Sequence, residues 1–67
     1  MKNIKTELGQ IMRLERKKKN MTQSDLANKI GSTITTISTI ERGTANPTLN
    51  NIINISKVLE INLFSIP

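Results

Sequence analysis

The sequence contains no cysteine and no histidine among its 67 residues, and its only aromatic residue is Phe64. Without cysteine there is no disulfide framework and no thiolate metal site, and without histidine the commonest general base and zinc ligand are missing. Long apolar runs are also absent, since the longest are pairs such as Ile52-Ile53. They are too short to span a membrane, and residues 1–5 lead into no signal-peptide core. We therefore expect a cytoplasmic protein with no metal and no cofactor.

The length of the chain predicts a single domain over residues 1–67, with little room for a substrate cleft. Ten lysine and arginine residues stand against five aspartate and glutamate residues, which gives a formal net charge of +5. A basic surface of this kind attracts nucleic acid, but it also attracts anionic membranes and acidic proteins. Composition alone leaves these three kinds of partner open.

Apolar residues recur at steps of three and four, the spacing of amphipathic helices. They predict a first helix from Ile4 to about Lys19, a second over about 22–30 and a third over about 33–43. A fourth helix follows Thr48, and Asn62 is expected to cap a last single turn. The β-branched stretch in the third segment is preceded by a cap and followed by glycine, which favours a helix over a strand. The sequence therefore predicts an all-α chain.

Several helix ends are marked by residues that satisfy unpaired backbone groups. Thr22 and Asp25 predict a capping box, and Gly31 predicts a left-handed exit from the second helix. The apolar periodicity predicts an inward face on each helix. The positions expected to face the core are Ile4, Leu8, Ile11, Met12, Leu26, Ala27, Ile30, Ile37, Ile40, Leu49, Ile52, Ile55, Ser56 and Leu59.

Two short helices joined by a glycine turn are the parts of a helix-turn-helix, whose second helix enters the major groove of DNA. The residues in and around this pattern are Arg16, Met21-Thr22-Gln23, Leu26-Ala27, Gly31, the stretch 37–43 and Pro47. Together they resemble the XRE-type family of phage repressors and Cro proteins, from about Leu8 to Leu59. The resemblance implies a lambda-repressor-like DNA-binding domain, a compact bundle of about five short helices with the helix-turn-helix at helices two and three.

The resemblance also implies that the recognition helix, about residues 33–42, lies in the major groove. The side chains expected to reach base edges are Ile34, Thr35, Ser38 and Thr39. None of them can make a bidentate contact to guanine or adenine, so we expect single hydroxyl bonds and apolar contacts to thymine methyl groups. A T-rich half-site follows, with the shape of the duplex supplying much of the discrimination. The alternative for Ile34 is a core position against the second helix.

Contacts to the DNA backbone are implied by the same resemblance. They are expected from Gln23, Thr33, Arg42, Thr44 and Asn46. Gln23 begins the second helix, where unpaired N–H groups and the positive end of the helix dipole favour an anion. Such contacts position the protein without reading sequence. The alternative for Gln23 is plain exposure to solvent, and we interpret the run 17–19 as cations that favour the end of the first helix.

The family pairs residues at the positions of Arg16 and Glu41, so a structural ion pair is expected between the first and third helices. Two positions depart from the family habit. Ser32 stands where a buried valine is usual, and we expect it to turn outward or to bond to the neighbouring backbone. Glu60 stands where glycine commonly ends the fourth helix, and it either enters the left-handed region at a cost or lengthens that helix.

The resemblance further implies a dimer, and the tail is more apolar than the surface of so small a monomer should be. The expected interface consists of Ile53, Leu63, Phe64 and Ile66. Phe64 is a natural anchor near a two-fold axis, and the alternative is that it covers the bottom of its own core.

The sequence thus predicts a homodimeric transcriptional regulator, a repressor or controller, that binds an inverted-repeat operator in double-stranded DNA. The alternative is an antitoxin that also binds a toxin protein. A membrane-surface or protein-interaction module is less favoured because the first helix lacks aromatic anchors. An enzyme is not expected because the few carboxylates are scattered and no phosphate loop is present. No small-molecule ligand and no membrane partner is expected.

Overall fold

The computed structural model describes residues 3–61, and this range contains helices and connections without a strand. The helices are α1 (Ile4–Lys18), α2 (Gln23–Ile30), α3 (Ile34–Glu41) and α4 (Leu49–Leu59). The expected all-helical fold is therefore confirmed, with four helices in the described range where about five were expected for the chain. The last turn expected at Asn62 lies outside the described residues.

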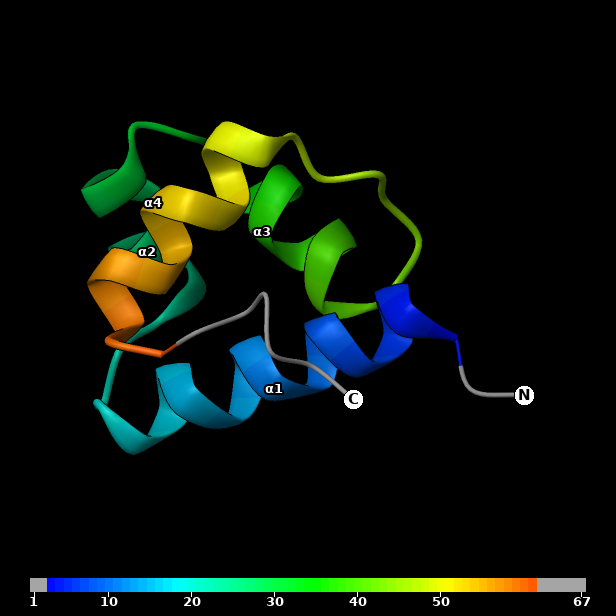
Figure 1. The fold of residues 1–67 in the computed structure, drawn as a ribbon. Coiled ribbons are helices and arrows are strands. Elements are labelled where there is room, and N and C mark those ends of the chain that lie inside the picture. Colours follow the sequence, from blue (N-terminus) through cyan, green and yellow to red (C-terminus); the bar gives the residue numbers. More distant parts are fainter. Residues whose placement is uncertain (1–2, 62–67) are drawn as a thin grey trace.

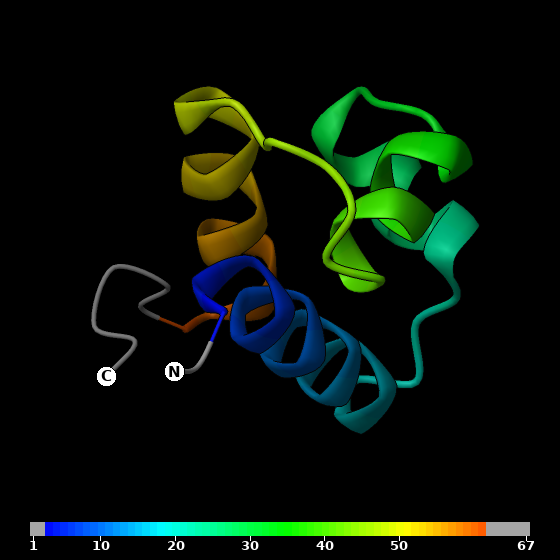
Figure 2. The same ribbon diagram turned by 90° about the vertical axis from the view of Figure 1, so that its right-hand side faces the viewer.

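α1 lies along one side of the molecule, and α2, α3 and α4 lie together on the opposite side (Figure 1). Seen after a 90° turn, α4 and the α2–α3 pair lie on opposite sides above α1 (Figure 2). α1 packs against α3 and α4, and α2 packs against the same two helices. Each helix therefore buries one face in a common core and leaves the other to solvent.

The core takes its side chains from all four helices. The buried apolar residues are Leu8, Met12, Leu26, Ala27, Ile37, Ile40, Ile55 and Leu59. All eight were expected there, and Ile11, Ile30 and Ile52 pack partly buried against them.

The expected inward face was wrong at two positions, Ile4 and Leu49, which are 69% and 62% exposed. Each is the first residue of its helix, and the first side chain of that helix to reach the core comes about one turn later, Leu8 in α1 and Ile52 in α4. Ser56 is half-buried, and its hydroxyl oxygen is enclosed without a hydrogen-bond partner among residues 3–61. Apolar spacing alone therefore placed the start of the inward face too early in both α1 and α4.

Every helix begins at a side chain that accepts a backbone hydrogen bond. Thr22, Thr33 and Thr48 each accept from the backbone N–H three residues further on, as their positions predicted. The expected capping box is confirmed, because Asp25 also accepts from the backbone N–H of Thr22. Asn3 caps α1, a role that the sequence analysis did not assign.

The residues at and just after the helix C-termini bear on three other expectations. Gly31 ends α2 in the left-handed conformation, with a φ of +68°. Glu60 ends α4 in the same conformation, with a φ of +58°, so the alternative that it lengthens α4 is wrong. The side chain of Ser32 is half-buried and bonds to no other described residue, so the expected bond from it to the neighbouring backbone is absent; only the backbone N–H of Ser32 donates, to the carbonyl of Ala27. α4 therefore ends where glycine is usual in the family, on a residue for which that backbone is strained.

Candidate nucleic-acid interface

α3 has one face in the core and one face in solvent. Ile37 and Ile40 are fully or almost fully buried, whereas Ile34 is 51% exposed and Thr35 is also exposed. Ser38 and Thr39 are half-buried at the edges of the exposed face. The alternative that Ile34 is a core residue is therefore wrong, and the helix presents a short apolar and hydroxyl surface to solvent.

The hydroxyl groups of this surface differ in whether they are free to donate a further hydrogen bond. Thr39 Oγ1 donates to the carbonyl oxygens of Thr35 and Thr36, at 3.0 Å each, so its hydrogen is engaged within the helix. Thr33 Oγ1 accepts from the backbone of Thr36 and shares a hydrogen bond with its hydroxyl. The hydroxyls of Thr35 and Ser38 bond to no other described residue. They are the free donors on this face, and Thr39 offers a methyl group and an acceptor.

The expected ion pair between Arg16 and Glu41 is present. Arg16 Nε donates to Glu41 Oε2 at 2.7 Å, and its Nη2 donates to Oε1 at 3.0 Å. The two side chains are 9% and 4% exposed. Arg16 Nη1 also donates to the backbone carbonyl of Met21, at 2.8 Å. One guanidinium thus joins α1 to the end of α3 and to the turn before α2.

Electrostatics within this pair favour its charged form. The hydrogen bonds to Glu41 raise the pKa of Arg16 above its ordinary value, and this effect outweighs the lowering caused by burial. A bidentate arginine–carboxylate contact of this kind is among the strongest polar contacts in proteins. The ion pair between Arg16 and Glu41 is therefore fixed in position and carries no net charge.

Gln23 is tied to the same carboxylate. Its Nε2 donates to Glu41 Oε1 at 3.1 Å, and the residue is half-buried at the first position of α2. The alternative of plain solvent exposure is therefore wrong for Gln23. Sequence reasoning missed this bond because the two residues are 18 positions apart and meet only when α2 packs on α3.

The remaining expected backbone contacts lie around the ends of α3. Thr33 is exposed at the N-cap, and Arg42 is exposed at the C-cap. Thr44 and Asn46 follow in the exposed connection to α4, which crosses in front of the molecule in Figure 2. Thr44 Oγ1 donates to the carbonyl of Thr39, whereas the side chains of Arg42 and Asn46 bond to no other described residue. A cation and an amide are thus left free just after α3.

Of the residues expected at a dimer interface, Ile53 lies among those that the structure describes. Ile53 is half-buried on α4, four positions after the exposed Leu49. Leu63, Phe64 and Ile66 lie outside the described residues, so both their interface role and the core alternative for Phe64 remain predictions.

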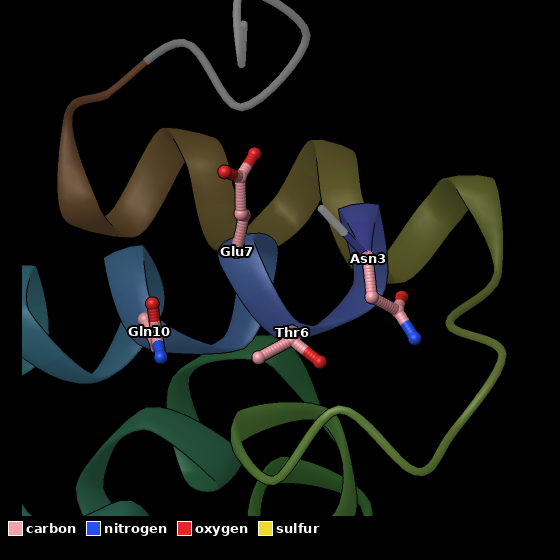
Figure 3. Close-up of a pocket in the computed structure, with 4 residues that line it drawn as sticks. All are labelled: Asn3, Thr6, Glu7 and Gln10. Carbon is pink, nitrogen blue, oxygen red and sulfur yellow. The ribbon is translucent and has the colours of Figure 1, made fainter. Parts of the chain in front are cut away.

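Outside this surface, the structure shows a shallow hollow beside the first half of α1. It is lined by Asn3, Thr6, Glu7 and Gln10. The Glu7 side chain points away from the side chains of Thr6 and Gln10, so the four do not converge on a common point (Figure 3). Among residues 3–61 no group of three or more histidine, cysteine, aspartate or glutamate side chains is placed to hold a metal ion. No helix in that range is long and apolar enough to cross a membrane.

Two short helices joined by a glycine turn, with a capped second helix and free polar side chains beyond its end, have the arrangement of a helix-turn-helix, which is typical of DNA-binding domains. Residues 12–66 match the family model described as Helix-turn-helix. The chain belongs to the XRE-type helix-turn-helix family of DNA-binding regulators, and the resemblance noted from the sequence is confirmed.

Two relatives illustrate the range of this family. The chain is 40% identical over 58 residues to the antitoxin HipB of Escherichia coli K12, an overlap of 87% of this chain. It spans 66% of the length of HipB. The crystal structure of the restriction–modification controller protein C.AhdI from Aeromonas hydrophila superposes with a TM-score of 0.82 at 30% identity, covering 90% of this chain and 91% of that one. The fold is thus that of a known controller protein.

Proposed function

We propose that the chain is a homodimeric transcriptional regulator of the repressor or controller type that binds an inverted-repeat operator through α3. The observation that carries this proposal is the two-sided α3, with Ile37 and Ile40 in the core and Ile34 and Thr35 in solvent. A helix held in this way presents its outer face to the major groove as a rigid unit. The likeness to the controller protein C.AhdI supports the regulatory role.

Base contacts are proposed for Ile34, Thr35, Ser38 and Thr39. Ile34 and the methyl group of Thr39 suit the thymine methyl, whereas Thr35 and Ser38 have free hydroxyls for single hydrogen bonds. Because no long polar side chain lies on this face, the proposed half-site is T-rich and is read weakly. Sequence-dependent bending between half-sites supplies the rest of the discrimination.

Backbone contacts are proposed on both sides of α3. Gln23 and Thr33 lie at the starts of α2 and α3, and Arg42, Thr44 and Asn46 lie beyond the end of α3. Contacts of this kind fix the register and tilt of the recognition helix on the duplex. The net charge of +5 adds an attraction to DNA that does not depend on sequence.

A dimer is proposed because a weakly reading helix needs two copies, one turn of DNA apart, to bind an operator usefully. The proposed interface includes Ile53 together with Leu63, Phe64 and Ile66. Sedimentation at low protein concentration tests it: Phe64→Ala is expected to dissociate the dimer. Leu14→Ala, which removes an exposed apolar side chain of α1, is the control expected to leave the dimer intact. An intact Phe64→Ala dimer would remove Phe64 from the interface.

The direct test of the proposed function is selection of bound duplexes from a random DNA pool, at low and at higher salt. Raising the salt weakens purely electrostatic binding and leaves sequence-dependent binding enriched. A T-rich inverted repeat with half-sites one helical turn apart is the expected result. Failure to enrich any sequence would contradict the proposal.

An antitoxin is the second candidate, favoured by the 40% identity to HipB. In that case the protein binds a toxin in addition to an operator. Affinity purification of the tagged protein from its source cell distinguishes the two roles. A toxin protein that copurifies in fixed stoichiometry supports the antitoxin, and its absence supports a regulator that acts alone.

A further inference from the structure

The carboxylate of Glu41 joins the start of α2 to the end of α3. Its Oε1 accepts two hydrogen bonds, from Arg16 Nη2 at 3.0 Å and from Gln23 Nε2 at 3.1 Å. Its Oε2 accepts a third, from Arg16 Nε at 2.7 Å. The amide of Gln23 is therefore anchored inside the protein at the position for which a phosphate contact is proposed.

We propose that Glu41 is a positioning residue for DNA binding, which acts by holding the side-chain amide of Gln23 in place for a phosphate of the operator. This inference rests on the proposed function. An amide nitrogen carries two hydrogens, of which one is donated to Glu41 and the other remains for a phosphate oxygen. The anchored side chain has already lost most of its rotamer freedom, so less entropy is lost when DNA binds.

Arg16 makes this arrangement compatible with a phosphate nearby. An unpaired carboxylate would repel the phosphates of the DNA backbone. The bidentate contact with Arg16, however, leaves the pair with no net charge. The Arg16 and Glu41 side chains are 9% and 4% exposed, so little solvent competes for the acceptor that Gln23 uses. The ion pair thus supplies a fixed acceptor without adding negative charge to the surface.

The backbone of Gln23 is fixed by the same group of residues. Arg16 Nη1 holds the carbonyl of Met21, and the Thr22–Asp25 capping box closes the first turn of α2. Gln23 lies within this turn, so both its backbone and its amide are constrained before DNA is present. This distinguishes it from Gln10, the other glutamine of the chain, which is exposed on α1 and whose side chain bonds to no other described residue.

A binding cycle tests the inference with four proteins: the parent, Gln23→Ala, Arg16→Met/Glu41→Met, and the triple variant. The paired methionines remove the acceptor and its counter-charge together, because replacing a buried pair by apolar residues commonly preserves folding. Each protein is assayed against the selected operator at a temperature where circular dichroism shows it folded. The readout is the effect of Gln23→Ala on the Kd in each background.

In the parent background Gln23→Ala is expected to weaken binding about tenfold, the value of a hydrogen bond to a charged group. In the Arg16→Met/Glu41→Met background the same change is expected to weaken binding less than about twofold, because a free Gln23 contributes little. An equal effect of Gln23→Ala in both backgrounds would overturn the inference and leave the proposed function standing. If the parent selects no DNA sequence at all, both fall together.

A second measurement needs no DNA and no folded variant. Nitrogen-15 relaxation of the two glutamine side-chain amides in the free parent is expected to show a rigid Gln23 and a mobile Gln10. This readout reports the anchoring itself, which a contribution of the ion pair to stability alone would not produce. If the Gln23 amide is as mobile as that of Gln10, Glu41 does not position it and the inference is wrong.

Discussion

Gly9 of α1 lies so close to Ile40 of α3 that a Cβ atom on Gly9 would overlap the backbone carbonyl oxygen of Ile40. The carbonyl oxygen of Glu41 is almost as near. Glycine inside a helix costs about 1 kcal/mol relative to alanine, so its presence in α1 needs a reason. The reason is the close approach of the two helices, which brings Arg16 within reach of Glu41.

Gly9→Ala is expected to lower the free energy of unfolding by about 1 to 3 kcal/mol, although alanine is the better helix former. The added methyl group meets backbone atoms, which cannot rotate away as a side chain can. Urea denaturation at neutral pH measures the change. Gln10→Ala, at the next and exposed position, is the control expected to change stability by less than about 0.5 kcal/mol. A Gly9→Ala variant as stable as the parent would contradict the close approach.

Breaking the ion pair on one side only is expected to be costly. Arg16→Met and Glu41→Gln should each lower the free energy of unfolding by on the order of 3 kcal/mol, because a charge is left unpaired in a site that excludes water. Arg16→Met/Glu41→Met is the matched control and should recover most of that loss. The comparison requires equilibrium denaturation of all three variants, and single variants as stable as the parent would disprove a structural role for the pair.

Asp25 should make stability depend on pH at the acidic end. The hydrogen bond from the backbone N–H of Thr22, with that from its side chain, lowers the pKa of Asp25 below its ordinary value. The stabilisation is therefore fully present above the unfolded-state pKa of about 3.9 and is lost as the pH falls through the lower folded-state pKa. Denaturation of the parent and Asp25→Asn between pH 7 and pH 2 should show a stability difference that shrinks over that acidic range. A difference that stays constant would rule out this linkage.

Glu60→Gly is expected to stabilise the protein by about 0.5 to 1 kcal/mol. Left-handed backbone costs a residue with a side chain about 1 to 2 kcal/mol, and glycine avoids most of that cost. The gain is reduced by loss of the exposed ion pair with Lys19 at 3.3 Å, which is worth at most about 1 kcal/mol. Thermal denaturation measures the net effect. Glu60→Gln keeps the strained backbone and removes only the charge, so any stabilisation it shows would point away from strain.

The base contact proposed for Ile34 predicts that operator binding depends on thymine methyl groups. Ile34→Ala is expected to weaken operator binding about fourfold, the value of one buried methyl group, with little effect on stability because Ile34 is half-exposed. Replacing the contacted thymines by uracil should weaken binding of the parent by a similar factor. The same replacement should have almost no effect on Ile34→Ala. Equal losses for both proteins would mean that Ile34 does not touch those methyl groups.

The sequence predicted the helices well because their ends are set by local chemistry. Thr22, Thr33 and Thr48 cap the helices they were expected to cap, and Gly31 takes the left-handed exit. Such features depend on a few neighbouring residues, so they can be recognised without the fold. The eight buried apolar residues were found in the same way, from helical periodicity.

What the sequence did not predict depends on how the helices meet. The bond between Gln23 and Glu41 and the contact of Gly9 with Ile40 both join residues that come together only in the packed structure. A glycine within the apolar pattern of α1 was the one available signal for the second. Ile4 and Leu49 fit the apolar spacing but lie at the first positions of their helices, where the pattern does not tell how far the core extends.

The division of α3 into an inner and an outer face has a consequence for how proteins of this type diverge. Ile34 and Thr35 contribute little to the core, whereas Ile37 and Ile40 are almost completely enclosed by it. Substitutions at the outer positions therefore alter the surface while leaving folding stability nearly unchanged. On the proposed function, two copies that arise by gene duplication can acquire separate operators through a few changes on the outer face of α3 while both remain folded.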